Sequence, residues 1–404
     1  MRARLAEVLH LFDRPLTSYY VIFGSMMLLI ALGLIMVLSS SSIDSLTETG
    51  SPYTLFRKQV ISVVIGLPLM LVASRLPPRV YRVIAYPLMV VAVLGLVAVL
   101  FMGDSYATGA VRWINIGGLT IQPSEPAKLA FVIWGADLLA RKEELNMLTE
   151  WRHLLVPLMP GVGVLTLLVL LGRDLGTSLV LMTAFLALLW VVGAPGRLFV
   201  GMLGLVALLV AIMVVVEPYR MDRLTSFIDP AADPGGTGYQ AMHGRYALGS
   251  GGLLGVGIGA SREKWQYLPH PESDFIFAII GEELGLVGSL LVIGLFGLFG
   301  YAGIRVAQRV RDPFMRLAAT ALTAWIVVQA LVNIGAVIGV LPITGIPLPL
   351  VSSGGSALVP TMFALGTLLS FAKREPGARQ ALAARGPGLP VRALSWLGLG
   401  SRKR

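Results

Sequence analysis

Residues 19–38 read Tyr-Tyr-Val-Ile-Phe-Gly-Ser-Met-Met-Leu-Leu-Ile-Ala-Leu-Gly-Leu-Ile-Met-Val-Leu, and none of these twenty side chains is charged. A helix of about 20 apolar residues is long enough to cross the hydrocarbon core of a bilayer. A leader that carries Arg2, Arg4 and Arg14 precedes the segment. Because the apolar run is too long for the core of a cleavable signal peptide, we expect it to be retained as a signal anchor.

Apolar segments of similar length recur along the chain, which predicts an all-α integral membrane protein with about ten transmembrane helices. The fourth segment is the weakest, because it is short and contains Lys128 and Asp137. The expected spans lie near residues 19–38, 59–74, 83–102, 126–140, 154–171, 175–193, 197–216, 275–302, 314–341 and 352–372.

The composition excludes most classes of soluble protein. Hydrophobic residues make up 56% of the chain, charged residues make up 13%, and the mean hydropathy is +0.79. A water-soluble domain carries roughly 25% charged residues. The sequence contains no cysteine, which excludes disulfides, thiolate metal sites and a cysteine nucleophile.

The basic residues flank the apolar segments and predict how the chain crosses the membrane. Of the 32 lysines and arginines, 22 lie at the termini and on one set of alternate loops. The positive-inside rule then puts both termini in the cytoplasm. We expect a cytosolic N-terminal segment at 1–18, one membrane domain at 19–372 and a flexible cytosolic tail at 373–404. The formal charge of +10 does not indicate a nucleic-acid partner, since the basic residues do not cluster with aromatic residues.

Three segments are then expected on the outer surface: 103–125, a large loop at 217–274 between the seventh and eighth spans, and 341–352. No Gly-Lys-Ser or Gly-Lys-Thr phosphate loop occurs in the sequence, which argues against nucleotide-driven chemistry. The run at 249–259 is rich in glycine. It is either a close-packed or re-entrant segment at the membrane surface or a flexible wall of a substrate groove.

Asp274 stands where the eighth span is expected to begin. A carboxylate there either caps the helix or, if partly desolvated at the membrane surface, serves as a general base. Glu282 and Glu283 follow about two turns later. Because a carboxylate exposed to lipid is costly, we expect both to face the bundle interior or a polar cavity. A structural partner and a role in the site are equally open for them.

Arg112, Gln122, Glu125 and Lys128 surround the outer entrance of the fourth span. Glu125 and Lys128 are three residues apart and would share a helix face, which predicts an internal ion pair. The alternative is a cationic site for a phosphate-bearing or otherwise anionic lipid headgroup. Composition does not separate the two interpretations.

A third polar region combines Asn333 with the stretch 341–356, which contains three prolines as well as Ser353 and Gly354. Prolines and small residues at membrane depth leave backbone groups without helical partners. Such irregular backbone persists only when it is buried in protein or lines a cavity. We therefore expect this region to form the wall of a groove.

Four motifs follow one another between residues 112 and 356, and the resemblance that they carry covers nearly the whole chain, from residue 19 to residue 373. They are Arg112-Trp-Ile leading to Gln122-Pro-Ser-Glu125 and Lys128, Asp174-Leu-Gly-Thr-Ser178, Asp274-Phe-Ile-Phe with Gly281-Glu-Glu-Leu-Gly285, and Thr344-Gly-Ile-Pro-Leu-Pro with Ser353-Gly-Gly-Ser356. The ordered set resembles the SEDS family, the membrane glycosyltransferases of cell shape, elongation, division and sporulation typified by FtsW, RodA and SpoVE. Lys264-Trp-Gln-Tyr-Leu-Pro269 and Met36-Val-Leu-Ser-Ser resemble the division and sporulation branch more than the elongation branch.

This resemblance implies polymerisation of the lipid-linked disaccharide-pentapeptide lipid II into glycan strands, at the outer face of the bacterial cytoplasmic (inner) membrane. By the match, Asp274 is the catalytic carboxylate. It is expected to take the proton from the acceptor 4-hydroxyl while that oxygen attacks the anomeric carbon of the donor and displaces the lipid pyrophosphate. A single displacement of this kind inverts the anomeric configuration.

The other matched positions imply binding roles. Arg112 and Lys128 are expected to bind pyrophosphate or sugar, and Gln122 and Glu125 to orient them. The remaining candidates are the substrate-binding Ser353 and Gly354 and the second-rank residues Asp174, Glu282 and Glu283. A divalent cation, Mg²⁺ or Mn²⁺, would help to neutralise the leaving group, although no ligand cluster in the sequence identifies a site for it.

The chain departs from the family at two places. Before the Phe of the third motif the family usually has Pro-Glu-Ala-His-Thr-Asp, whereas this chain has Pro269-His-Pro-Glu-Ser-Asp274. The roles of His270 and Glu272 therefore cannot be carried over. Arg173 also stands where the family commonly has Pro.

The resemblance implies a class B penicillin-binding protein as the transpeptidase partner, together with other divisome proteins and membrane lipids. Two other functions compete with polymerisation. A lipid II flippase would need polar helices that reach both membrane faces. A non-catalytic scaffold that recruits a transpeptidase would not need Asp274.

Overall fold

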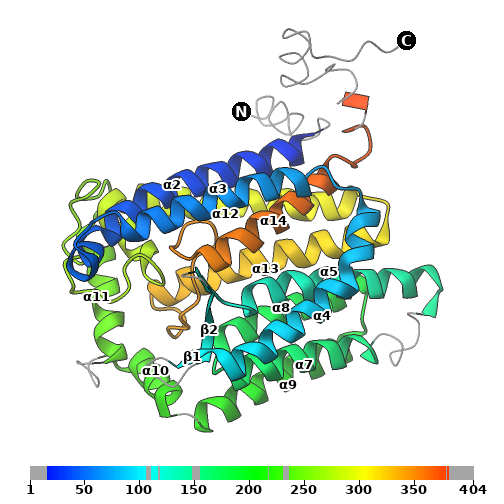
Figure 1. The fold of residues 1–404 in the computed structure, drawn as a ribbon, viewed down its shortest axis with the longest axis horizontal. Coiled ribbons are helices and arrows are strands. Elements are labelled where there is room, and N and C mark those ends of the chain that lie inside the picture. The colour runs from blue at the N-terminus through cyan, green and yellow to red at the C-terminus, as the bar shows by residue number, and fades with distance from the viewer. Residues whose placement is uncertain are drawn as a thin grey trace.

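The computed structural model describes residues 16–105, 111–116, 119–147, 155–216, 218–230, 236–378 and 380–381. Long α-helices lie side by side along the long axis of the molecule (Figure 1). The helices are α2 (Thr17–Thr49), α3 (Thr54–Ala73), α4 (Pro78–Met102), α5 (Ser124–Glu144), α7 (Leu158–Leu171), α8 (Leu175–Val192), α9 (Gly196–Val216), α10 (Pro218–Ile228), α11 (Thr237–Ser250), α12 (Ile276–Arg309), α13 (Pro313–Val337) and α14 (Gly355–Ala372).

Each of the ten expected spans falls on one of these helices. Seven helices in the described ranges are long and apolar enough to cross a membrane: α2, α3, α4, α8, α12, α13 and α14. Two further apolar segments, α7 and residues 196–208 of α9, are shorter. The prediction of an all-α, multi-span membrane protein is confirmed. The number of spans and their orientation stay predictions, as do the three expected chain segments.

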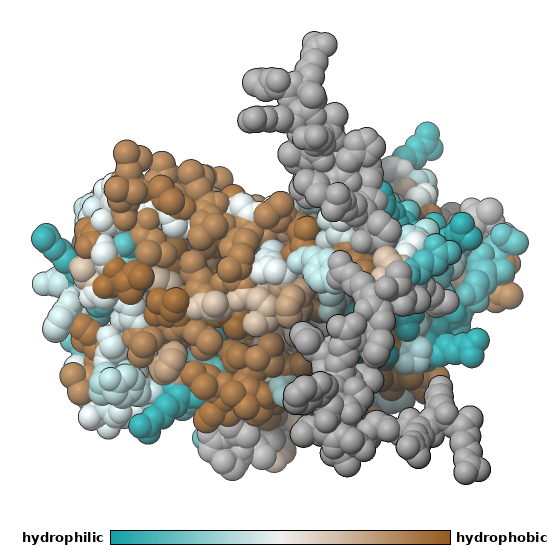
Figure 2. All heavy atoms as spheres, turned by 90° about the horizontal axis from the view of Figure 1, so that it is seen from above, coloured by the Kyte–Doolittle hydropathy of each residue, from teal (hydrophilic) through white to brown (hydrophobic). Residues whose placement is uncertain are grey.

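The outer surface of the bundle is apolar where lipid would contact it. Figure 2 shows a broad hydrophobic band across one face, with hydrophilic side chains toward both ends of the molecule. Val64 on α3 and Val83 and Val91 on α4 are more than 60% exposed. Such exposure would be costly in water and is favourable in a hydrocarbon phase.

Helix α5 is the weakest expected span, and its buried carboxylate Asp137 is paired within the protein. Asp137 is fully buried, and its two carboxylate oxygens accept from Arg82 Nε of α4 at 2.7 Å and from Arg141 Nε at 2.8 Å. Charged residues in a membrane domain are expected to pair in this way. The charge that weakens the hydropathy of α5 therefore joins it to α4.

A small sheet follows α4 in a segment for which the sequence predicted only a loop. Strands β1 (Asp104–Ser105), β2 (Val111–Ile116) and β3 (Leu119–Ile121) pair antiparallel in the order β1-β2-β3. Ile114 of β2 lies opposite Ile121 of β3. The sheet leads directly into α5 and carries Arg112, so it fixes one of the expected site residues.

Helix α12 is broken at Gly285, whose backbone angles are φ 68° and ψ −164°. The glycine-rich run fills the break: Val256 N–H donates to the carbonyl of Glu282, and Leu286 N–H donates to the carbonyl of Gly252, each at 3.0 Å. A Cβ at Gly251 would clash with the backbone of α12. The run is therefore a close-packed segment, the first of the two interpretations.

The loops with candidate site residues gather at one end of the bundle, on the left of Figure 1. Helices α10 and α11 lie there, within the expected loop at 217–274. Helix α13 contacts α5, α8, α11, α12 and α14, and so forms the centre of the bundle. It is capped by Asp312, which accepts a hydrogen bond from Met315 N–H at 3.1 Å.

Candidate functional site

Asp274 lies two residues before the start of α12. Phe275 occupies the N-cap position, and no side chain caps this helix. Within the described residues, the Asp274 carboxylate accepts one hydrogen bond, from the hydroxyl of Ser273 at 3.0 Å. Capping therefore does not account for Asp274, and most of its hydrogen-bonding capacity remains open.

The carboxylate borders a hollow whose lining includes Asn333, Thr344 and Ile346. Asn333 Nδ2 donates to the carbonyls of Asp274 at 2.9 Å and Ile346 at 2.8 Å, which fixes the orientation of its amide. Its Oδ1 and the hydroxyl of Thr344 are buried and have no hydrogen-bond partner in the described part of the chain. A buried polar atom without a partner costs about 1–3 kcal/mol, and a bound ligand would remove that cost.

Ser353 and Gly354 hold the Asp274 segment through their backbone. Ser353 N–H donates to the carbonyl of Glu272 at 2.8 Å, and Gly354 N–H donates to Gln59 Oε1 of α3 at 3.2 Å. Gly354 also stands at the N-cap position of α14, with φ 157°. These contacts join α3, α14 and the residues before α12 around Asp274.

Glu272 is a second carboxyl group close to Asp274. Burial raises the pKa of Glu272, and the negative charges of Asp44 and Asp274 raise it further, while His270 acts in the opposite direction. The protonated form of Glu272 is therefore favoured relative to an exposed glutamate. Asp274, at the edge of the hollow, has the more open carboxylate.

Arg112, Gln122 and Asp174 meet at the start of α8. Asp174 caps this helix, and its Oδ2 also accepts from Gln122 Nε2 at 3.0 Å. Arg112 donates through Nη2 to the carbonyl of Arg173. Arg112 Nε and Ser124 Oγ border a second hollow beside Asp174, and both are buried without a partner among the described residues. Arg112 and Gln122 of the first motif and Asp174 of the second motif thus form one polar group.

Glu125 and Lys128 form a buried ion pair. Lys128 is 1% exposed, and its ammonium lies 2.9 Å from Glu125 Oε1, 3.0 Å from Gln329 Oε1 and 5.2 Å from the ring centroid of Trp325. Gln329 Nε2 donates to the carbonyl of Pro347 at 3.1 Å. The expected internal ion pair is present, and it supports the wall formed by the linker between α13 and α14.

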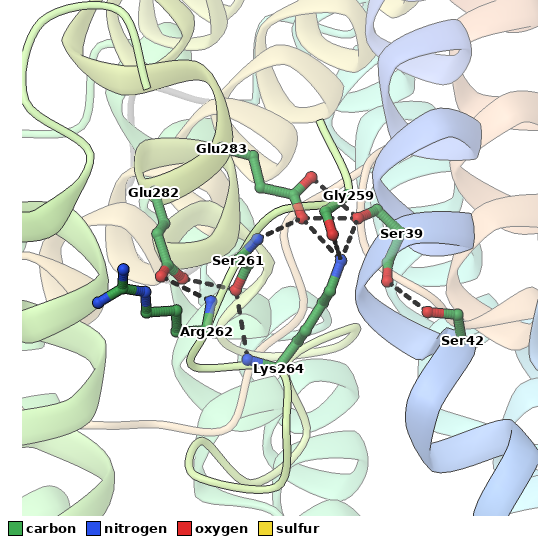
Figure 3. Close-up of polar contacts among 8 residues, drawn as sticks. All are labelled: Ser39, Ser42, Gly259, Ser261, Arg262, Lys264, Glu282 and Glu283. Atoms are coloured by element: carbon green, nitrogen blue, oxygen red, sulfur yellow. Dashed lines mark hydrogen bonds and ion pairs between the residues drawn. The ribbon is translucent and has the colours of Figure 1, made fainter. Parts of the chain in front are cut away.

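Glu282 and Glu283 face the bundle interior, as expected, and each is 1% exposed (Figure 3). Glu283 accepts from Ser39 of α2 at 2.6 Å and from the Lys264 ammonium at 3.1 Å. Glu282 accepts from the hydroxyl of Ser261. The structural partner is therefore Lys264, in the loop between α11 and α12, and the network ties that loop to α2 and to the break in α12.

The linker between α13 and α14 and the first turn of α14 connect the segment before α5 to the segment that carries Asp274. Ser356 Oγ accepts from Gln122 N–H at 3.2 Å and donates to the carbonyl of Thr120 at 2.9 Å, while Ser353 reaches Glu272. Sequence reasoning missed Gln59 and Gln329, although a glutamine in an apolar helix is the signal that could have identified them.

The donor set does not fit a protein-held divalent cation. Among the described residues, no group of three or more His, Asp or Glu side chains is arranged to hold a metal ion. Mg²⁺ is usually bound through one or two carboxylates together with substrate phosphates. A cation in this reaction would therefore have to arrive with the substrate, and no step below depends on it.

Comparison with known proteins identifies the family of this chain. The model of a family described as "Cell cycle protein", which groups FtsW, RodA and SpoVE, matches residues 19–376. The chain is 44% identical to the probable peptidoglycan glycosyltransferase FtsW of Mycobacterium bovis, over 92% of this chain and 71% of that protein. It is 37% identical to the stage V sporulation protein E of Bacillus subtilis, over 86% and 94%.

A solved structure shares the fold. It is described as "Structural coordination of polymerization and crosslinking by a peptidoglycan synthase complex", and it superposes with a TM-score of 0.70 at 28% identity, covering 87% of this chain and 96% of that one. The family match extends over nearly all of the described membrane domain. The chain belongs to the FtsW/RodA/SpoVE family of membrane proteins.

Proposed function

We propose that this protein is a peptidoglycan glycosyltransferase that polymerises lipid II for septal wall synthesis. Relatives over most of the chain carry the name peptidoglycan glycosyltransferase. The observation that carries the proposal is the carboxylate of Asp274, which accepts a single hydrogen bond within the described residues. It lies beside Asn333 Oδ1 and the Thr344 hydroxyl, for which the same residues supply no partner.

The reaction follows from the chemistry of the carboxylate. Asp274 takes the proton from the acceptor 4-hydroxyl as that oxygen forms a bond to the anomeric carbon of the donor. The bond from that carbon to the pyrophosphate oxygen breaks, and its electron pair leaves with the lipid pyrophosphate. Because attack and departure occur on opposite faces, the anomeric configuration inverts.

Of the other candidate residues, some are proposed to contact the substrate and others to hold the site in place. Arg112 has a buried Nε that faces the hollow beside Asp174, which supports a contact with the sugar or pyrophosphate of a lipid-linked substrate. Gln122 donates to Asp174, which borders the same hollow, so we assign Gln122 to positioning. Lys128 is paired with Glu125 inside the protein, so we assign both to positioning the groove wall.

The remaining residues position the catalytic segment. Ser353 and Gly354 bind through backbone groups that fix Glu272 and α14, so a substrate contact would use the Ser353 hydroxyl. Glu282 and Glu283 hold the outer loop.

We further propose that the site faces outward from the bacterial cytoplasmic membrane. The excess of basic residues on the opposite loops supports this orientation. A class B penicillin-binding protein is the proposed partner, since the solved relative belongs to a complex of polymerisation and crosslinking. Other divisome proteins follow from a septal role.

A reconstitution assay tests the function. The purified protein with its transpeptidase partner should convert lipid II into glycan polymer, whereas the partner alone should make none. Lipid II movement across vesicle membranes is measured in parallel. Movement without polymer would support a flippase, and the absence of both would support a scaffold; either result would overturn the proposal.

A further inference from the structure

A third hollow, distinct from the one beside Asp174, adjoins the hollow at Asp274, and two arginines line it. Arg223 comes from α10 and Arg245 from α11, and Ala336 and Ile343 line both this hollow and the hollow that Asp274 borders. Two guanidinium groups and a carboxylate therefore surround two adjoining spaces at the loop end of the bundle.

Arg223 is held toward Asp274 by the linker between α13 and α14. Its Nη1 donates to the carbonyl of Ile343 at 3.0 Å. A Cβ at position 345 would lie 3.5 Å from Arg223 Nη1 and 3.5 Å from Asp274 Oδ2, so these two atoms are at most about 7 Å apart. Gly345, with φ 72°, leaves the space between them open.

Arg245 lies against the C-terminal end of α13. Gly339 has φ 80°, and a Cβ there would clash with the Arg245 guanidinium. A helix C-terminus attracts a cation, which would explain the position of the arginine without any ligand. That explanation leaves the donors of Arg245 unused, because the described residues supply its side chain with neither a hydrogen bond nor an ion pair.

The residues that the sequence suggested for an anion are less suited to this position. Lys128 is buried against Glu125 and Gln329, and Arg112 lies beside Asp174 in a different hollow. Neither borders the space next to Asp274.

We propose that Arg223 and Arg245 form the binding subsite for the pyrophosphate of the lipid-linked donor, a residue assignment that rests on the function proposed above. A guanidinium binds phosphate oxygens through a planar fork of N–H donors. The negative charge on the pyrophosphate grows as its bond to the anomeric carbon breaks, and two guanidinium cations stabilise that charge. The carboxylate on the other side of Gly345 remains free to take the acceptor proton.

Direct binding of geranylgeranyl pyrophosphate tests the subsite without requiring turnover. Its dissociation constant for the detergent-purified protein, in complex with its partner, is measured by equilibrium dialysis for wild type, Arg223→Gln, Arg245→Gln and Arg245→Lys. The matched control is Arg262→Gln, because Arg262 is an exposed arginine on the same outer loop.

Loss of a charge-assisted hydrogen bond weakens binding by roughly tenfold or more. We expect this increase in dissociation constant for Arg223→Gln and Arg245→Gln, a smaller one for Arg245→Lys, and less than twofold for Arg262→Gln. Geranylgeranyl monophosphate should bind more weakly than the pyrophosphate to wild type. Dissociation constants that are unchanged in both glutamine variants would overturn the proposal.

Two further measurements separate the alternatives. Equal competition by phosphatidylglycerol would show a general site for anionic headgroups and would also overturn the pyrophosphate assignment. If Arg223→Gln does not fold, Arg245→Gln carries the test, since its side chain is exposed. Polymer formation by wild type reports on the proposed function separately, because binding is measured without lipid II.

Discussion

Replacing Lys264 with Met tests whether the buried network in Figure 3 holds the loop between α11 and α12 to the helix bundle. The Lys264 ammonium donates to Ser39 Oγ at 3.1 Å, to the carbonyl of Gly259 at 2.6 Å and to Glu283 Oε1 at 3.1 Å. Methionine has a similar length and preserves much of the packing, but it removes the charge and all three hydrogen bonds.

The expected loss of unfolding free energy follows from the burial of Glu283, the member of the ion pair that remains. Lys264 is 4% exposed and Glu283 is 1% exposed. Removing one member of a buried ion pair costs about 3–5 kcal/mol, because the other charge is left uncompensated. We expect a loss of unfolding free energy in this range for Lys264→Met.

The double variant Lys264→Met/Glu283→Gln removes both charges and should recover part of that loss. The two residues are in contact, so we expect a coupling energy of at least about 1 kcal/mol in the double-mutant cycle. The control Arg262→Met removes an exposed arginine from the same loop and should change stability by less than about 0.5 kcal/mol.

Unfolding by sodium dodecyl sulfate in mixed micelles, followed by far-ultraviolet circular dichroism, gives these free energies. A loss below about 1 kcal/mol for Lys264→Met, or strictly additive effects of the two substitutions, would refute the reasoning. In that case the Lys264–Glu283 ion pair would not anchor the loop between α11 and α12.

Three other predictions concern stability and use the same unfolding measurement. Gly285→Ala should lower the unfolding free energy by about 2 kcal/mol or more, because Gly285 has φ 68° and the glycine-rich run leaves no room for a Cβ. The control Gly294→Ala has open space at its Cβ and should not lower the unfolding free energy. Equal losses in the two variants would contradict the close packing at Gly285. Asp137→Asn should lower the unfolding free energy by about 1.5–3 kcal/mol, since it removes the buried carboxylate that accepts hydrogen bonds from the partly exposed Arg82 and Arg141; an unchanged unfolding free energy would contradict this prediction. Glu272 has a raised pKa in the folded state, so its protonated form stabilises the fold below the unfolded value of 4.5, and that stability is lost as pH rises through the folded pKa; Glu272→Gln should remove this decline, and identical pH profiles would contradict it.

Much of the fold could be predicted from apolar periodicity, because a membrane requires helices of a set length. The ten expected spans coincide with helices, including α5 with its charged residues. The extension of α2 to Thr49 could not be predicted, since that last part is polar and leaves the apolar pattern. The break at Gly285 depends on a distant glycine-rich run, and no local signal in the α12 sequence reveals that contact.

Part of the candidate site could be predicted from local sequence, and the rest depends on contacts between residues far apart in the chain. Asp274 could be singled out because it stands where the eighth span begins and matches a family motif. The choice between an ion pair and a ligand site for Lys128 required the third partner, Gln329, which lies 201 residues away in sequence. Arg223 and Arg245 were counted only as loop charges, because their approach to Asp274 is produced by the packing of α10 and α11 against the end of α13.

The catalytic role of Asp274 is tested most directly by the polymerisation rate of Asp274→Asn, in protein shown to fold, to bind its partner and to bind lipid II as wild type does. Glu48→Gln, which removes an exposed carboxylate from the end of α2, is the control. Loss of a general base should lower the rate by about 10²–10⁴-fold, with the control unchanged. A rate within a few-fold of wild type for Asp274→Asn would contradict the account.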